Sequence, residues 1–323
     1  MDSFALVMTG AAVLALALML LQKRETGIRT GTAFIFGALA FPLCVLAGRA
    51  AFFLCSFDWI KNSELSFWGF ISSGYSYMLY GAVLGGFAAV FLTAKITGQP
   101  FGKIADAAAA PAALLIIAGR FAEYLIGAGY GTGVKTWFDP EGEWSMIAWE
   151  EPDAICRFPF AVKNYYGAWR FSINLWEGLA AVVFLIVLLR MRKRKTGGAC
   201  TLLLLMYASC QIIFESMRKD EVIIWSFVKA NQLISAILVL GILIFCWLKQ
   251  PKEERNVKEL CIRTVLLLLF AGIIMLLEFA LDQKINFLLW MRVDLNYLVM
   301  AACCVGMLLT VLPQWRKAWP KED

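Results

Sequence analysis

Arg120 and Glu123 lie within an otherwise apolar run of the sequence. Together with Tyr124 and Gly127 they are spaced i, i+3, i+4 and i+7, which places all four on one face of a helix. A guanidinium in hydrocarbon is energetically costly, so an arginine within a membrane helix marks a functional surface by default. The alternative is an internal pair in which Arg120 and Glu123 merely neutralise each other.

The elements that must position these residues are membrane-spanning helices. Hydrophobic residues make up 61% of the chain and the mean hydropathy is +0.70, which is too apolar for a soluble globular domain. Apolar stretches of about 20 residues, the length that crosses a bilayer as a helix, recur along the sequence. We predict an all-α integral membrane protein, a polytopic bundle of about nine helices. The expected spans are 4–22, 32–56, 72–94, 104–126, 172–190, 198–217, 229–248, 260–281 and 296–312.

Lysine and arginine collect in alternate loops, and this bias sets the expected orientation. The first span has its basic residues after it, which predicts an uncleaved anchor with the N-terminus outside and the C-terminus cytoplasmic. The net charge of +6 is spread over these loops, so we expect no nucleic-acid partner. The basic set is Lys23, Arg24, Arg29, Lys95, Lys103, Arg190, Arg192, Lys193, Arg194, Lys195, Lys249, Lys252, Arg255, Lys258, Arg316, Lys317 and Lys321.

The longest predicted connection is external and follows the fourth span, at about residues 127–171. It opens with a glycine-rich run and continues through a tryptophan- and acid-rich stretch, so we expect a small cap made of turns or short strands. We divide the chain into a membrane core of residues 1–248 and an additional C-terminal two-helix segment of residues 249–323 with a cytoplasmic tail.

Polar side chains from four spans are expected at one depth, near the external ends of the helices. Carboxylates cannot reach far along a helix to water, so Glu177 and Glu215 beside arginines indicate a shared, partly hydrated cavity. Two guanidinium groups there would suit an anionic lipid head group, because their fork matches phosphate oxygens. For Tyr75 and Trp176 an interfacial aromatic belt is the favoured interpretation. The layer comprises Tyr75, Tyr77, Tyr80, Arg120, Glu123, Asn174, Trp176, Glu177, Tyr207, Gln211, Glu215 and Arg218.

Several classes of function lack support in the sequence. Histidine is absent and the cysteines have no metal-ligand spacing, so we predict neither a metal site nor a cofactor. Only Cys156 lies in an external loop, which argues against a disulfide framework. The sequence has no visible internal repeat, and no polar stripe crosses the full membrane depth. A transporter or channel therefore has little support. Gly81 and Gly85 form a small-xxx-small pattern that is typical of close helix packing.

Six motifs in order resemble the prolipoprotein diacylglyceryl transferase family, over roughly residues 40–248. The run from Gly119 to Gly131 is similar to the signature Gly-Arg-x-Gly-Asn-Phe-x-Asn-Gly-Glu-x-x-Gly. The run starting at Tyr80 is similar to a His-Gly-Gly-Leu-Ile-Gly-type motif. Residues 207–218 are similar to Tyr-Gly-x-Phe-Arg-x-x-x-Glu-x-x-Arg. Weaker likenesses lie at Asp106 to Pro111, Arg170 to Glu177, and Asn231 to Ser235. In addition to these six motifs, Arg49 fits an early arginine of the family.

The resemblance implies an activity and its partners. It implies transfer of a diacylglyceryl group from phosphatidylglycerol to the thiol of a prolipoprotein signal-sequence cysteine, in a bacterial plasma membrane. The product would be a thioether, and glycerol phosphate would leave. The candidate catalytic residues are Tyr80, Glu123 and Arg120. The candidate residues for the phospholipid head group are Arg120, Tyr207, Gln211, Glu215, Arg218 and Glu177.

Four positions depart from the family motifs. Tyr80 stands where the family has its histidine, Glu123 where it has asparagine, Gln211 where it has arginine, and Ala128 where it has glutamate. A tyrosine phenol is a poorer base than histidine at neutral pH, and Gln211 removes a positive charge from the phosphate site. Two readings therefore stay open: a diverged transferase, or a catalytically impaired relative that binds phospholipid or a lipoprotein-like partner without transfer.

Overall fold

The protein is a bundle of long apolar helices, seen here in a computed structural model. The structure describes residues 3–56, 66–69, 77–131, 133, 160–163, 169–191, 196–218, 224–225, 228–282, 284–285, 291 and 293–320. Within these residues, nine helices are long and apolar enough to cross a membrane, so the predicted all-α polytopic membrane protein is confirmed. They are α1 (Ser3–Leu21), α3 (Thr30–Cys55), α6 (Leu79–Thr97), α7 (Phe101–Ile126), α9 (Ile173–Arg190), α10 (Gly198–Met217), α11 (Ala230–Lys249), α12 (Val257–Leu281) and α13 (Val293–Ala318).

Two helices differ most from the expected spans. Helix α6 begins at Leu79 because Met78 has an extended backbone (φ −110°, ψ 118°) and donates its N–H to the carbonyl of Gly48 at 3.1 Å. Tyr75 lies outside the described residues. Helix α13 continues through Pro313 to Ala318, past the expected end at residue 312, and this added turn buries Trp315.

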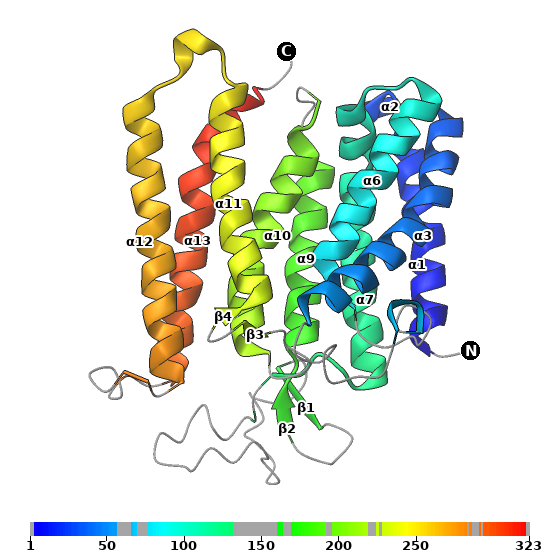
Figure 1. Ribbon diagram of the computed structural model, residues 1–323. Coiled ribbons are helices and arrows are strands. Elements are labelled where there is room, and N and C mark those ends of the chain that lie inside the picture. Colours follow the sequence, from blue (N-terminus) through cyan, green and yellow to red (C-terminus); the bar gives the residue numbers. More distant parts are fainter. Residues whose placement is uncertain are drawn as a thin grey trace.

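The helices lie side by side in a row that is more than one helix deep at one end (Figure 1). Helices α12 and α13 form one edge, followed by α11, α10 and α9, and then by α6, α7, α3 and α1. Helix α10 contacts α7, α9, α11 and α13, which makes it the centre of the bundle. The added C-terminal pair therefore packs against the same helix that carries the predicted polar stripe.

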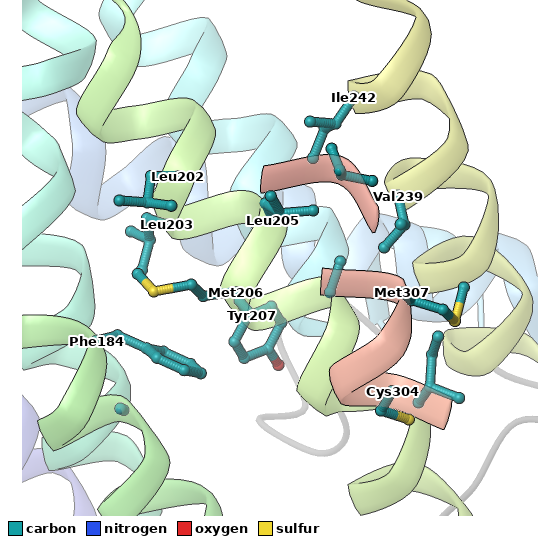
Figure 2. Packing of buried hydrophobic residues seen from close by; sticks show 14 of the residues in the cluster. Phe184, Leu202, Leu203, Leu205, Met206, Tyr207, Val239, Ile242, Cys304 and Met307 are labelled. Carbon is teal, nitrogen blue, oxygen red and sulfur yellow. The ribbon is translucent and has the colours of Figure 1, made fainter. Parts of the chain in front are cut away.

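The main hydrophobic core surrounds the first half of α10. Figure 2 shows Leu202, Leu203, Leu205 and Met206 of α10 between Phe184 on one side and residues of α11 and α13 on the other. Leu205 is completely buried, and each such leucine contributes about 1.5–3 kcal/mol relative to an exposed one. The second half of the same helix begins at Tyr207 and carries Gln211 and Glu215 beside buried apolar residues such as Ile212, so the candidate site borders the core.

The two ends of the bundle differ in character. The short helix α2 (Lys23–Thr26), the 3₁₀ turn at Lys252–Glu254 and the C-terminus lie at one end, where the basic connections collect (Figure 1). At the other end β1 (Ala161–Lys163) pairs antiparallel with β2 (Trp169–Phe171), and β3 (Ile224–Trp225) pairs with β4 (Val228–Lys229).

The described part of the expected cap contains short strands, as the sequence predicts. Backbone bridges join Gly133 to Arg170 and Gly131 to Arg218, which ties this segment to the end of α10. The β3–β4 hairpin was not expected from the sequence. The acid-rich stretch, Cys156, residues 192–195 and Lys321 lie outside the described residues.

Gly81 and Gly85 pack α6 closely against α3, as their spacing predicts. A Cβ on Gly85 would lie 2.3 Å from the carbonyl oxygen of Leu43, and one on Gly81 would lie 2.5 Å from that of Ala47. These atoms belong to the backbone and cannot rotate away, so the two helix axes approach as closely as glycine permits.

We predict that Gly85→Ala destabilises the bundle by about 1–3 kcal/mol, because overpacking forces α3 and α6 apart. Thermal unfolding in detergent measures this loss. Gly86→Ala is the matched control, since its Cβ would meet only the Cys44 sulfur at 3.7 Å, an ordinary contact. Equal stability of the two variants would contradict the close helix contact.

Candidate functional site

Polar side chains of five helices gather towards the end of the bundle where the strands lie. Arg120 and Glu123 belong to the last two turns of α7, and Glu177 belongs to the second turn of α9. Glu215 lies in the last turn of α10, and Asn231 in the first turn of α11. Tyr80 comes from the first turn of α6. The sequence predicts such a layer from the four spans that correspond to α6, α7, α9 and α10, and the structure adds Asn231 of α11.

Arg120 is the centre of an ion-pair cluster. The residue is 7% exposed, and its Nη1 donates to both carboxylate oxygens of Glu123, at 2.6 and 2.7 Å. Its Nη2 donates to Oε1 of Glu177 at 2.6 Å. The internal pair considered as the alternative does form, and a second carboxylate from α9 joins it.

Arg218 and Tyr207 complete this cluster. The Nη2 of Arg218 lies 3.8 Å from Oε2 of Glu123, and its Nη1 lies 3.9 Å from Oε2 of Glu177. The Tyr207 hydroxyl donates to Oε1 of Glu177 at 3.2 Å. Two guanidinium groups thus face two carboxylates and their formal charges balance. This balance lets the cluster persist among apolar helices, where an unpaired charge would be costly.

A glycine turn shapes the space beside Glu123. Gly127 ends α7 in the left-handed region (φ 74°), and Ala128 then donates its N–H to the Glu123 carbonyl at 2.9 Å. A Cβ on Gly129 would lie only 2.8 Å from Oε2 of Glu123, so glycine leaves room for the carboxylate. Burial raises the pKa of Tyr130 in the same turn, and nearby Tyr124 raises it further, so this phenol stays protonated.

A second polar cluster lies around Glu215. Gln211 donates its amide to Oε2 of Glu215 at 3.3 Å, and Asn231 donates its amide to Oε1 at 3.0 Å. The backbone carbonyl of Asn231 accepts from the Ser235 hydroxyl at 2.6 Å, and Ser235 shares a 2.5 Å hydrogen bond with the Tyr80 hydroxyl. Tyr80 is thereby linked to α11.

The two clusters meet at a pair of aromatic rings. The rings of Tyr80 and Tyr207 lie edge to face, with centroids 6.0 Å apart. Tyr207 bonds with the ion-pair cluster and Tyr80 with the cluster around Glu215. All eight candidate residues of the sequence therefore lie in one connected region. Gln211 bonds with Glu215, and Glu215 bonds with Asn231 of α11, rather than with Arg120.

Three buried acceptor atoms in this region have no hydrogen-bond partner among the described residues. They are Oε2 of Glu177, Oε1 of Gln211 and Oδ1 of Asn231. Both amides donate to Glu215, which fixes their oxygen atoms facing away from it. A buried acceptor without a donor costs about 1–3 kcal/mol, so the region is suited to a ligand that brings hydrogen-bond donors.

Besides Asn231 and Ser235, Lys229 and Gln232 were missed as site residues by the sequence analysis. Lys229 donates from Nζ to the carbonyls of Glu215 and Ser216, at 2.8 and 2.7 Å, and so caps the end of α10. Gln232 donates to the Glu278 carboxylate at 2.5 Å, which connects α11 to the additional helix α12. A carboxylate within a membrane helix, such as Glu278, by itself indicates a functional or paired position, but the sequence spacing does not identify Gln232 as its partner.

We predict that Arg120→Gln destabilises the protein by about 3–5 kcal/mol, because it leaves buried Glu177 without its closest charge partner. Thermal unfolding in detergent measures the change. The double variant Arg120→Gln with Glu177→Gln should recover part of the loss, since no unpaired carboxylate then remains. A double variant less stable than the single one would show that the Arg120–Glu177 contact is not the stabilising interaction.

Comparison with known proteins agrees with the resemblance seen in the motifs. The family model described as prolipoprotein diacylglyceryl transferase matches residues 1–248. The phosphatidylglycerol–prolipoprotein diacylglyceryl transferase of Bacillus velezensis is 23% identical over 77% of this chain and 88% of its own length. The protein of the same name from Shouchella clausii is 26% identical over 66% of this chain and 75% of its own length. This chain therefore belongs to the prolipoprotein diacylglyceryl transferase family.

Proposed function

We propose that this membrane protein transfers the diacylglyceryl group of phosphatidylglycerol to the thiol of a prolipoprotein signal-sequence cysteine. The observation that carries the proposal is the buried Arg120 cluster, which lies within the residues that the family model matches. The guanidinium groups of Arg120 and Arg218 are suited to the phosphate of the lipid and of the leaving glycerol phosphate. The unpartnered acceptors of Glu177 and Gln211 are suited to the hydroxyl groups of a glycerol head group.

In the proposed reaction the cysteine sulfur attacks the glycerol carbon that carries the phosphate ester. The C–S bond forms, the C–O bond breaks, and its electron pair leaves with the phosphate. The thiol proton goes to a protein base, for which Tyr80 and Glu123 are the candidates. Tyr80 lies between the two clusters and Glu123 lies beside the guanidinium groups, so either is close to the region where the phosphate would be held.

The second candidate function is binding of a phospholipid or of a lipoprotein-like partner without transfer. The two carboxylates bonded to Arg120 favour this non-catalytic function, because they compete with a lipid phosphate for Nη1 and Nη2 of the guanidinium. The engagement of Tyr80 by Ser235 favours it as well, since a hydroxyl held in this way is less free to accept a proton.

Transfer of labelled diacylglycerol from phosphatidylglycerol to a peptide with a signal-sequence cysteine separates the two functions. We expect thioether product with the wild type and a loss of about 100-fold or more with Tyr80→Phe if the phenol takes part in proton transfer. Ser235→Ala is the matched control, because it removes the partner of Tyr80 and keeps the phenol. Absence of product from the wild type, with phosphatidylglycerol binding retained, would instead establish the non-catalytic function.

We further propose that the basic end of the bundle faces the cytoplasm of a bacterial cell, with the N-terminus and the polar clusters on the outer side. Helix α2 (Lys23–Thr26) and the turn at Lys252–Glu254 lie at one end of the bundle (Figure 1), and the lysine and arginine residues of such connections support this orientation. We predict that green fluorescent protein fused after Asp323 is fluorescent and that alkaline phosphatase fused there is inactive. An active alkaline phosphatase fusion would contradict the proposed orientation and place the C-terminal end outside.

A further inference from the structure

Both terminal nitrogens of the Arg120 guanidinium already have carboxylate partners. Its Nη1 is bonded to both oxygens of Glu123, and its Nη2 is bonded to Glu177. A lipid phosphate that accepts from both of these nitrogens must compete with the carboxylates.

We propose that Glu123 holds the place of the donor phosphate in the resting protein, and that the phosphate, on binding, displaces Glu123 from Arg120 and releases it to accept the thiol proton. This inference rests on the proposed transfer function. It gives Glu123 two successive roles, as the internal counter-ion of Arg120 and then as the base.

Glu123 is the carboxylate that can leave. Its side chain is 23% exposed, whereas that of Glu177 is 2% exposed and also accepts from the Tyr207 hydroxyl. Glu123 lies in the last turn of α7, beside Gly129, which has no Cβ to crowd the carboxylate. Glu177 is buried in the second turn of α9.

A second partner for Glu123 is near at hand. Its Oε2 lies 3.8 Å from Nη2 of Arg218, so a shift of about 1 Å converts this long ion pair into a direct hydrogen bond. The released carboxylate therefore need not become an isolated charge in the membrane. The exchange moves Glu123 from one guanidinium towards the other while the phosphate takes the first.

The charge balance couples phosphate binding to proton removal. Arg120 and Arg218 balance Glu123 and Glu177, so a bound phosphate adds excess negative charge to the ion-pair cluster. This excess negative charge favours uptake of a proton by the cluster, also when Glu123 has moved towards Arg218. Uptake of the thiol proton by Glu123 restores the balance, and the thiolate then attacks the glycerol carbon with glycerol phosphate as the leaving group.

The test compares binding with transfer in Glu123→Gln. We expect this variant to bind phosphatidylglycerol in detergent micelles roughly tenfold more tightly than the wild type, because the competing charge is gone, and to lose most of its transfer activity. Glu259→Gln is the matched control: Glu259 also pairs with an arginine, Arg263, at 2.7 Å, but at the opposite end of the bundle. It should change neither binding nor transfer.

Each outcome separates the inference from the proposed function. Unchanged or weaker binding by Glu123→Gln, with an active wild type, overturns the exchange and leaves the transferase intact. Tighter binding by the variant, with a wild type that transfers nothing, keeps Glu123 as the competitor of phosphate and overturns its role as base. Glu123→Asn, which also removes the charge, replaces the glutamine variant if that protein does not fold as judged by thermal unfolding.

Discussion

The buried guanidinium of Arg120 is the interaction on which the rest of this membrane protein depends. A charge within apolar helices requires partners at hydrogen-bond distance, and the partners come from α7 and α9. This requirement fixes the depth of both helices and brings their backbones close together. Gly178 follows directly after Glu177 and permits that approach, since a Cβ there would lie 3.4 Å from the Cβ of Arg120.

Helix α10 joins this electrostatic constraint to the hydrophobic core. Its first half packs leucine and methionine side chains between α9, α11 and α13 (Figure 2), and its second half carries Tyr207, Gln211 and Glu215. The apolar half gives the helix a fixed position, so that its polar half reaches neighbours in α9 and α11. Tyr207 belongs to both halves: its ring is buried in the core and its hydroxyl bonds with Glu177.

Hydropathy and helical spacing were sufficient to predict the bundle and the layer of polar residues, because span length and helix period are local properties. The contacts within the layer were not predictable in the same way. The i, i+3 spacing offered an Arg120–Glu123 pair as an alternative, but the bond of Arg120 with Glu177 joins residues 57 positions apart. The start of α6 was also missed, because it depends on a backbone bond between Met78 and Gly48 of another helix.

The additional hairpin of α12 and α13 bears on the site although it lies beyond the residues that the family model matches. Glu278 of α12 accepts from Gln232 of α11, and the same Gln232 amide donates to the carbonyl of Ile212 on α10. Gln232 follows directly after Asn231, the residue that holds Glu215. A bond that fixes the first turn of α11 also fixes Asn231 and, one turn later, the Ser235 hydroxyl that bonds with Tyr80. The hairpin therefore stabilises the cluster around Glu215 through α11. It contributes no group to the ion pairs of Arg120 that the structure describes.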